Sequence, residues 1–367
     1  MSYLFPMMFL IIIITVYTGV NWWIYHSLLQ AMSQWPCWVK NGFSTLYWCL
    51  ALAFIFLEMF HKKLPLNVAH VFYLVSTGWL AVFLYLALSL AFIALVRWVG
   101  ISVPYAWPIC FVLVTILLII GNVRFNRPVT KHMHIHLSAK SGHADTMRVV
   151  AVSDLHLGYG INKKRLDSYV RLINNEHPDL ILIGGDLIDM SVRPLWDEKM
   201  QEELNRLEAP LGVYMIPGNH EYISGINEAC HFIRTTGIKL LRDSIVNLPN
   251  GILLVGRDDR SNERRKTISQ LLERTEGKTP VFVLDHQPAN EEVEQMVNRN
   301  VDFAFFGHTH QGQIWPLNWI TAWIYNQSHG YRQRNHTHLY VSSGLGLWGP
   351  PFRIGTDSEL TVFDFTF

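Results

Sequence analysis

The feature that most constrains this chain is the near absence of charge in its first third. Up to Ile120, the Lys, Arg, Asp and Glu residues are only Lys40, Glu58, Lys62, Lys63 and Arg97. From Val123 onward charged residues are dense, although they make up only 16% of the whole chain. So sharp a change of composition marks a change of solvent. It predicts a membrane part followed by a water-soluble part.

The apolar third contains four stretches of the length that a membrane helix requires. A helix needs about 20 mostly apolar residues to cross a bilayer. Four runs meet this condition, at about residues 4–24, 43–60, 69–96 and 103–120. Trp22, Trp98 and Trp107 stand near their ends, and such rings favour the membrane–water interface. We therefore predict a four-helix transmembrane region over residues 1–122, and a multi-pass protein of the cell membrane.

The distribution of basic residues predicts the orientation. An even number of spans puts the N-terminus, the second loop and the C-terminal part on one side of the membrane. That side carries, close to the spans, Lys62, Lys63, Arg124, Arg127 and Lys131. The other side has Lys40 and Arg97. Because loops rich in Lys and Arg stay in the cytoplasm, we expect a cytoplasmic catalytic domain. The formal charge of +1 gives no reason to expect a nucleic-acid partner.

We interpret residues 123–146 as a linker. His132, His134 and His136 alternate in it. Alternation fits either a strip of metal ligands or a short strand with its histidines on one face. Histidine ligands usually have a carboxylate or carbonyl partner, and no carboxylate stands nearby in the sequence, so the strand is favoured.

Residues 147–367 have the pattern of an α/β domain. Short apolar runs typical of buried strands stand at residues 147–152, 180–183, 213–216, 252–255, 281–284 and 303–306. Helical stretches alternate with them, at about residues 163–176, 197–207, 226–236, 267–274 and 291–298. Such alternation predicts sheets covered by helices.

Chemically distinctive residues follow five of these strands. They are Asp154, His156, Asp186, Asn219, His286, His308 and His310. In open α/β sheets the functional crevice lies at the carboxyl ends of the strands, so all of them can meet at one edge. Carboxylate, amide and imidazole donors without thiolate suit Mn, Fe or Zn. We expect two such divalent ions sharing one carboxylate, with a bridging hydroxide that attacks a phosphorus atom. His220, directly after Asn219, is the expected catalytic residue, placed either to protonate the leaving group or to hydrogen-bond the transferring phosphoryl group.

These segments resemble the calcineurin-like metallophosphoesterase superfamily, whose motifs run D-x-H, G-D, G-N-H, H and G-H-x-H in this order. The tail, with Ser343-Gly344-Leu345-Gly346 and Ser358-Glu359-Leu360, is similar to a bacterial membrane-associated, YkuE-like branch. The resemblance implies a four-layer αββα fold. It implies a first metal bound by Asp154, His156, Asp186 and His310. It implies a second bound by Asp186, Asn219, His286 and His308, with Asp186 bridging and His220 catalytic.

An aromatic stretch follows the last expected ligands. Residues 314–325 include Trp315, Trp319 and Trp323. Such a stretch either packs on the domain's own core or dips into the lipid headgroup region. In the second case Trp319 and Trp323 contact a lipid-linked substrate, and the guanidinium groups of three arginines can pair with its phosphate. These are Arg332, Arg334 and Arg353.

Three functions remain open from the sequence. The first is hydrolysis of a phosphodiester or pyrophosphate bond in a lipid-linked substrate at the bilayer. The second is a phosphodiesterase for soluble small molecules that the helices merely tether. The third is an inert membrane sensor. The complete ligand set argues against the third, because a two-metal clamp needs all of its ligands.

Overall fold

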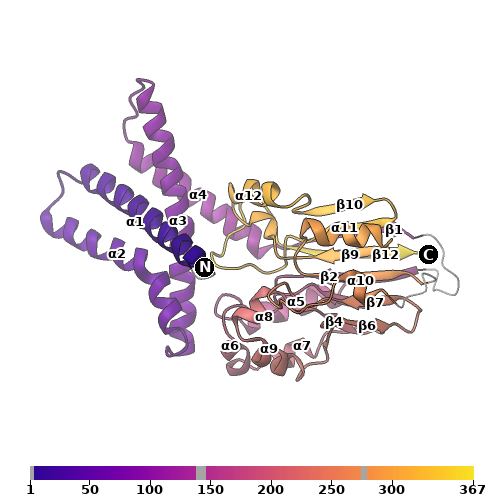
Figure 1. Ribbon diagram of the computed structural model, residues 1–367. Helices are drawn as coiled ribbons and strands as arrows, with labels where there is room; N and C mark the ends of the chain where they lie inside the picture. The colour runs from indigo at the N-terminus through magenta and orange to yellow at the C-terminus, as the bar shows by residue number, and fades with distance from the viewer. Residues whose placement is uncertain (1–3, 138–145, 274–278) are drawn as a thin grey trace. The chain divides into compact units, whose positions relative to one another are not determined.

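The computed structural model describes residues 4–137, 146–273 and 279–367. The chain divides into two compact units, Met1–Gly121 and Asn122–Phe367. Figure 1 shows the helical first unit in indigo and purple, and the sheets of the second in magenta to yellow.

The first unit is made of long helices: α1 (Leu4–Ala31), α2 (Cys37–Phe60), α3 (Leu66–Trp98) and most of α4 (Ala106–Asn126). Pro36 and Pro65 stand directly before α2 and α3, where a fixed φ suits a helix start. Among the described residues, α2, α3 and α4 are long and apolar enough to cross a membrane. The chain therefore has the character of a multi-pass membrane protein. The span predicted at residues 4–24 falls in α1, whose earliest side chains lie outside the described part, so a fourth span stays a prediction.

The second unit contains two six-stranded mixed sheets. The first has the order β1 (Val129–His136), β12 (Glu359–Thr366), β2 (Thr146–Val152), β3 (Leu180–Ile183), β4 (Val213–Met215), β5 (Lys239–Leu240). The second has the order β10 (Gly330–Arg334), β11 (Thr337–Val341), β9 (Phe303–Phe306), β8 (Val281–Leu284), β7 (Leu253–Gly256), β6 (Ser244–Asn247). Strands β2 to β5 run parallel, as do β7, β8, β9 and β11.

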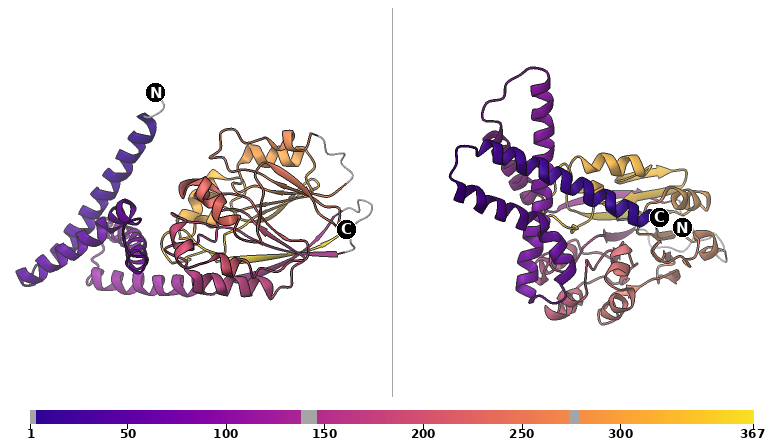
Figure 2. Two further views of the ribbon diagram at one scale, coloured as in Figure 1. Left: turned by 90° about the horizontal axis from the view of Figure 1, so that it is seen from below. Right: turned by 60° about the vertical axis from the view of Figure 1, so that its left-hand side comes forward.

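Alternation along the strands builds three apolar layers. On β2, Val149 and Ala151 point into the core between the sheets, whereas Val150 and Val152 point to the outer face. This follows from the period of two along a strand. Helices cover both outer faces, as Figure 2 shows in its left view. The first sheet is covered by α5 (Lys163–Asn174), α6 (Arg193–Asp197) and α9 (Ile226–Ile233), and the second by α10 (Ile268–Leu271) and α11 (Asn290–Asn298).

Short helices complete the unit: α7 (Gln201–Leu204), α8 (Asn219–Ile223), the 3₁₀ turn η1 (His310–Gly312) and α12 (Leu317–Ile324). The helix α5 shows why such elements form. The Asn162 side chain caps it by accepting from the Arg165 N–H, and Leu166, Val170 and Ile173 recur at helical spacing on its buried face.

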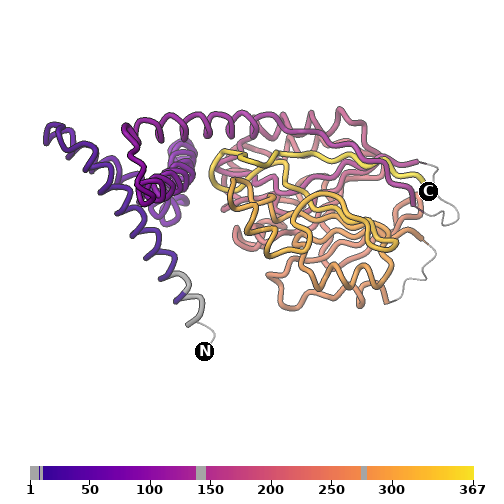
Figure 3. Tube along the Cα trace, turned by 90° about the horizontal axis from the view of Figure 1, so that it is seen from above, coloured from indigo at the N-terminus to yellow at the C-terminus, as the bar shows by residue number. Residues whose placement is uncertain are grey.

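The linker predicted at residues 123–146 is corrected in part. Residues 129–136 form the edge strand β1, which runs parallel to β12 from Val129 to His136, as the two traces in Figure 3 show. His134 lies 3.8 Å from the Asp364 carboxylate, and His132 lies 3.6 Å from that of Glu176. The alternating histidines are therefore those of a strand. Residues 138–145 of the predicted linker lie outside the described residues.

Candidate metal centre

The expected ligands come together where the parallel strands of the two sheets end. Asp154 and His156 follow β2, Asp186 follows β3, and Asn219 begins α8 after β4. The other sheet contributes His286 after β8, and His308 and His310 after β9. Because parallel strands present their carboxyl ends at one edge, residues more than 150 positions apart reach one another.

The backbone at this edge adopts conformations that ordinary residues avoid. Five of the expected ligands have a positive φ, between 47° and 71°: Asp154, His156, Asp186, His308 and His310. Each such residue costs of the order of 1–3 kcal/mol, and these conformations concentrate at functional sites. Gly307 is required here, because a Cβ atom at this position would lie 2.5 Å from the Asp154 carboxylate. The fold therefore gives up stability in order to aim these side chains inward.

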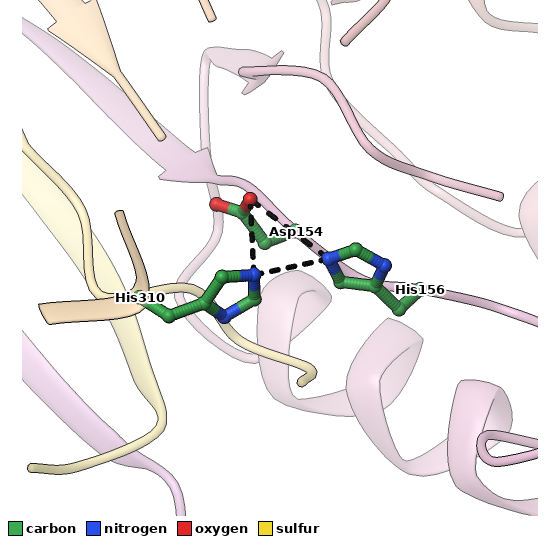
Figure 4. Close-up of side chains that lie close together, drawn as sticks. All are labelled: Asp154, His156 and His310. Carbon is green, nitrogen blue, oxygen red and sulfur yellow. Dashed lines mark hydrogen bonds and ion pairs between the residues drawn. The ribbon is translucent and has the colours of Figure 1, made fainter. Parts of the chain in front are cut away.

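The first cluster is Asp154, His156 and His310, shown in Figure 4. The Nε2 atoms of His156 and His310 face each other at 3.1 Å. The Nε2 atom of His310 lies 3.5 Å from Asp154 Oδ1, and that of His156 lies 3.8 Å from Asp186 Oδ2. Burial, together with the neighbouring His156 and Arg353, lowers the pKa of His310 well below its usual value. His310 is therefore neutral at pH 7, which is the form in which histidine binds a metal.

The second cluster is Asp186, His286 and His308, joined by Asn219. His286 Nε2 lies 3.1 Å from both Asp186 Oδ2 and Asn219 Oδ1. His308 Nδ1 lies 2.9 Å from the same Asn219 oxygen. Burial, followed by the neighbouring His286, lowers the pKa of His308 to about 4. Asp186 contacts members of both clusters, so its carboxylate is placed to be shared.

The second nitrogen of His286 shows which atom is left for a metal. His286 Nδ1 lies 2.8 Å from the carbonyl oxygen of Gly184, which can only accept, so the proton belongs on Nδ1. The lone pair of Nε2 then faces Asp186 and Asn219. A metal-ligating histidine typically donates its other N–H to a carbonyl or carboxylate in this way.

The charges also fit bound cations. Asp154 and Asp186 are at most 2% exposed. Within the described ranges, neither pairs with a Lys or an Arg; their ion-pair partners are histidines. Buried carboxylates without a fixed cation are costly unless a metal neutralises them. The donor set of oxygen and imidazole nitrogen atoms is that of a site for two divalent transition-metal ions, whose identity it leaves open.

His220 lies beside the first cluster, with its ring centre 4.6 Å from that of His156. Its Nδ1 lies 3.3 Å from Asp189 Oδ1, and the same oxygen lies 3.5 Å from His156 Nδ1. Burial by itself lowers the pKa of His220, but Asp189 and Asp186 together raise it to about 9. Asp189 thus orients both an expected ligand and the expected catalytic residue.

Sequence reasoning assigned no role to Asp189 or Glu221. Glu221 is fully buried, and its carboxylate accepts from the backbone N–H groups of Asp186, Ile188 and Gly218. It therefore ties the loop after β3 to the loop after β4. The sequence feature that could have indicated Asp189 and Glu221 is an acidic residue within three positions of an expected ligand, in a segment with few charges.

All three arginines expected to meet a substrate have partners within the protein. Arg353 is fully buried and donates to the carbonyl oxygens of His310, Gly344 and Gly346. It acts on the site by holding the loop that carries His310. Arg334 forms a two-pronged ion pair with Glu294 on α11. Arg332 is exposed and donates to the carbonyl oxygen of Asn326.

Residues 314–325 do not pack on the domain core as a whole. Ile314 is buried, but α12 has no buried residue, and Trp319 and Trp323 are 64% and 87% exposed. The rim of the site is aromatic as well. The Tyr325 ring centre lies 6.3 Å from that of His308, and that of Trp348 lies 6.4 Å from His220.

Comparison with known proteins shows which family this part of the chain resembles. Residues 147–312 match the model of a family described as calcineurin-like phosphoesterase. An uncharacterized metallophosphoesterase of Helicobacter pylori is 32% identical over 240 residues, which are 64% of this chain and 63% of that protein. YkuE of Bacillus subtilis, also an uncharacterized metallophosphoesterase, is 29% identical over 60% of this chain and 79% of its own length. A transmembrane protein with metallophosphoesterase domain of Danio rerio is 31% identical over 59% of this chain and 52% of its own. The chain thus spans less than two thirds of the length of two of these three relatives.

Proposed function

We propose that this chain is a membrane-anchored phosphoesterase with two metal ions, as the match of residues 147–312 to the calcineurin-like phosphoesterase family and the buried His/Asp clusters support. It hydrolyses a phosphodiester or pyrophosphate bond. The observation that carries this proposal is the convergence of seven oxygen and imidazole donors, from five strand ends, around a buried carboxylate that both clusters share.

The ligands divide into two sets. The first ion would be held by Asp154, His156, Asp186 and His310. The second would be held by Asp186, Asn219, His286 and His308, so that Asp186 would contribute to both sites. When bound, two such cations neutralise phosphoryl oxygens and activate water as the nucleophile. The donor types suit Mn, Fe or Zn.

His220 acts as the general acid. Its Nδ1 faces Asp189, which keeps a proton on that nitrogen and leaves Nε2 as the atom that serves the substrate. The raised pKa of about 9 favours the imidazolium at neutral pH. Nε2–H can then donate its proton to the leaving-group oxygen. The half-exposed Trp348 beside His220 borders the space for that leaving group.

The substrate we propose is lipid-linked, and the catalytic domain is cytoplasmic. The apolar helices support a membrane location, and the excess of basic residues after the second and fourth predicted spans supports the orientation. The exposed Trp319 and Trp323, next to the metal centre, support a lipid. A phosphodiesterase for soluble molecules that is merely tethered remains the second candidate, supported by the half-exposed Trp348 beside His220.

Metal removal tests the proposal. The full chain in detergent is treated with chelator and assayed on bis-p-nitrophenyl phosphate, and Mn, Fe or Zn is then added back. We expect turnover to vanish on chelation and to return with about two metal ions bound per chain, measured by elemental analysis. Turnover that survives chelation, or full activity with a single bound ion, would contradict a two-metal centre.

A further inference from the structure

The helix α12 has an apolar surface that the protein itself leaves uncovered. We call it the α12 surface, and it consists of Trp315, Leu317, Trp319, Ile320, Trp323 and Ile324. All of these side chains are exposed by 36% or more. Soluble proteins rarely expose so many large apolar side chains side by side, and such a patch marks a contact with a membrane or a partner.

The α12 surface is attached to the metal centre at both of its ends. Before α12, η1 begins at His310, and Gly312 packs so closely on the backbone of Asn318 that a Cβ atom could not fit there. After α12, the Tyr325 ring approaches His308, and Thr309 Oγ1 donates to the Ser328 carbonyl oxygen at 2.6 Å. A membrane or partner that contacts α12 therefore lies next to the rim of the metal centre.

The last turn of α4 belongs to the second unit and contacts the loop beside α12. Asn122 Nδ2 donates to the Pro351 carbonyl oxygen at 3.0 Å. The neighbouring Pro350 carbonyl oxygen accepts from the Gln313 side chain, and the Trp315 N–H donates to the Ile354 carbonyl oxygen. Phe125 is buried in the core of the unit, with Arg165 stacked 4.5 Å above its ring. The end of α4 and the base of α12 are thus fixed to one loop, residues 348–354.

The helix α4 is long and apolar enough to cross a membrane. Its apolar run ends at about Ile120, and Asn122 and Arg124 follow directly in the same helix. The polar end of a membrane helix is the part that meets the headgroup layer. The loop bonded to Asn122 is therefore tied, through the chain itself, to the end of a candidate span.

We propose that the α12 surface docks into the headgroup layer of the bilayer that α4 spans. Tryptophan is enriched in this layer, and an exposed helix with one apolar face binds there by burying that face. The inference rests on the proposed function and deepens it, because docking brings the metal centre to the phosphate groups of membrane lipids. The substrate is then a phospholipid or lipid pyrophosphate that reacts without leaving the bilayer. Trp319 and Trp323 are membrane contacts in this arrangement.

The first experiment reports docking without any catalysis. In a full chain whose four cysteines are replaced by serine or alanine, Cys is introduced at Trp323 or, as the control, at the exposed Gln333 on β10. Each variant is labelled with an environment-sensitive dye and reconstituted into vesicles of phosphatidylcholine and phosphatidylglycerol at 3:1. Lipids with a shallow spin label should quench the dye at position 323 several-fold more than the dye at position 333. Equal quenching at the two positions overturns the proposal.

The second experiment compares substrates that share a leaving group. Bis-p-nitrophenyl phosphate is soluble, and phosphatidyl-p-nitrophenol is presented in the same vesicles. Ile320→Glu should lower turnover of the lipid by about five- to tenfold and leave turnover of the soluble diester within twofold of wild type. The matched control, Gln333→Glu, adds the same charge on β10 and should change neither. Equal effects of Ile320→Glu on both substrates, or none on either, contradict the proposal.

Together, the two experiments distinguish failure of the docking proposal from failure of the proposed function. Wild-type turnover of the soluble diester without any of the lipid overturns the lipid substrate and leaves the phosphoesterase intact. Turnover of neither diester counts against the proposed function, while the dye at position 323 still decides whether α12 docks.

Discussion

The metal centre and the α12 surface are opposite exceptions to the usual distribution of side chains. At the metal centre, Asp154, His156 and Asp186 are charged or polar and almost fully buried. On α12, Trp319 and Trp323 are apolar and mostly exposed. Proteins normally bury apolar groups and leave carboxylates in water, so each region implies something outside the chain. We propose that cations compensate the first and that lipid covers the second.

The two regions differ in how closely the sequence must define them. The metal centre depends on single atoms, held by strained backbone and by hydrogen bonds such as that from Gly218 N to Glu221. The α12 surface depends only on apolar character over a helix face. At the metal centre, a substitution that keeps the shape of a side chain but changes one atom should therefore strongly reduce metal binding and activity. On α12, loss of a whole side chain should leave the fold intact.

The largest effect should come from Asp186→Asn. This change removes the charge of the carboxylate that contacts both clusters, while its size stays the same. Loss of the shared ligand forfeits several kcal/mol of transition-state stabilisation, or a fall in kcat/KM of about 10³-fold or more. Elemental analysis should find fewer than two ions per chain. Asp364→Asn, which removes a surface partner of Arg148, is the control and should keep both metal and activity. An Asp186→Asn enzyme with two ions and normal turnover would remove Asp186 from the bridging role.

His220→Ala should have the next largest effect. It removes the proposed proton donor and none of the proposed ligands. We expect kcat to fall by about 10²–10⁴-fold, the usual contribution of general acid–base catalysis, while two ions remain bound. The loss should be smaller for a substrate whose leaving group needs no proton, such as p-nitrophenolate, than for an alkyl ester. If His220→Ala loses a metal ion, the residue is a ligand and the proton donor lies elsewhere.

Asp189→Asn should have an intermediate effect. Asp189 touches no substrate, but it orients His156 and His220 through their Nδ1 atoms. Removing such a partner typically costs 10–100-fold in activity or metal affinity. The pH profile distinguishes orientation from simple damage. Without the Asp189 charge the pKa of His220 should fall, so that activity is lost at a lower pH than in the wild type. An unchanged profile with lower activity would limit Asp189 to a structural role.

The sequence could bring the expected ligands close together because they stand at strand ends, where order along the chain translates into position. It could not assign Asp189 or Glu221, because their partners are set by tight turns between the loops. Nor could it find the pairing of β1 with β12, which joins Val129 to Glu359, residues that lie at opposite ends of the domain sequence. The burial of Arg353 could not be foreseen for a similar reason, since a buried arginine and an exposed one look alike until the carbonyl groups around it are known.

The smallest expected effect is that of Trp323→Ala on the free energy of unfolding. It tests most directly the contrast between the α12 surface and the buried parts of the domain. Trp323 is 87% exposed, so its removal should change the free energy of unfolding by no more than about 0.5 kcal/mol. Phe282 is also aromatic, but it is fully buried between the sheets, and Phe282→Ala should cost about 3–5 kcal/mol. Urea titration of the full chain in detergent, followed by circular dichroism, measures both variants under the same conditions. A loss above about 2 kcal/mol for Trp323→Ala would mean that α12 packs on its own domain and has no face left for the membrane. A neutral result leaves Trp323 without a role in folding, and its apolar surface then requires a partner outside the chain.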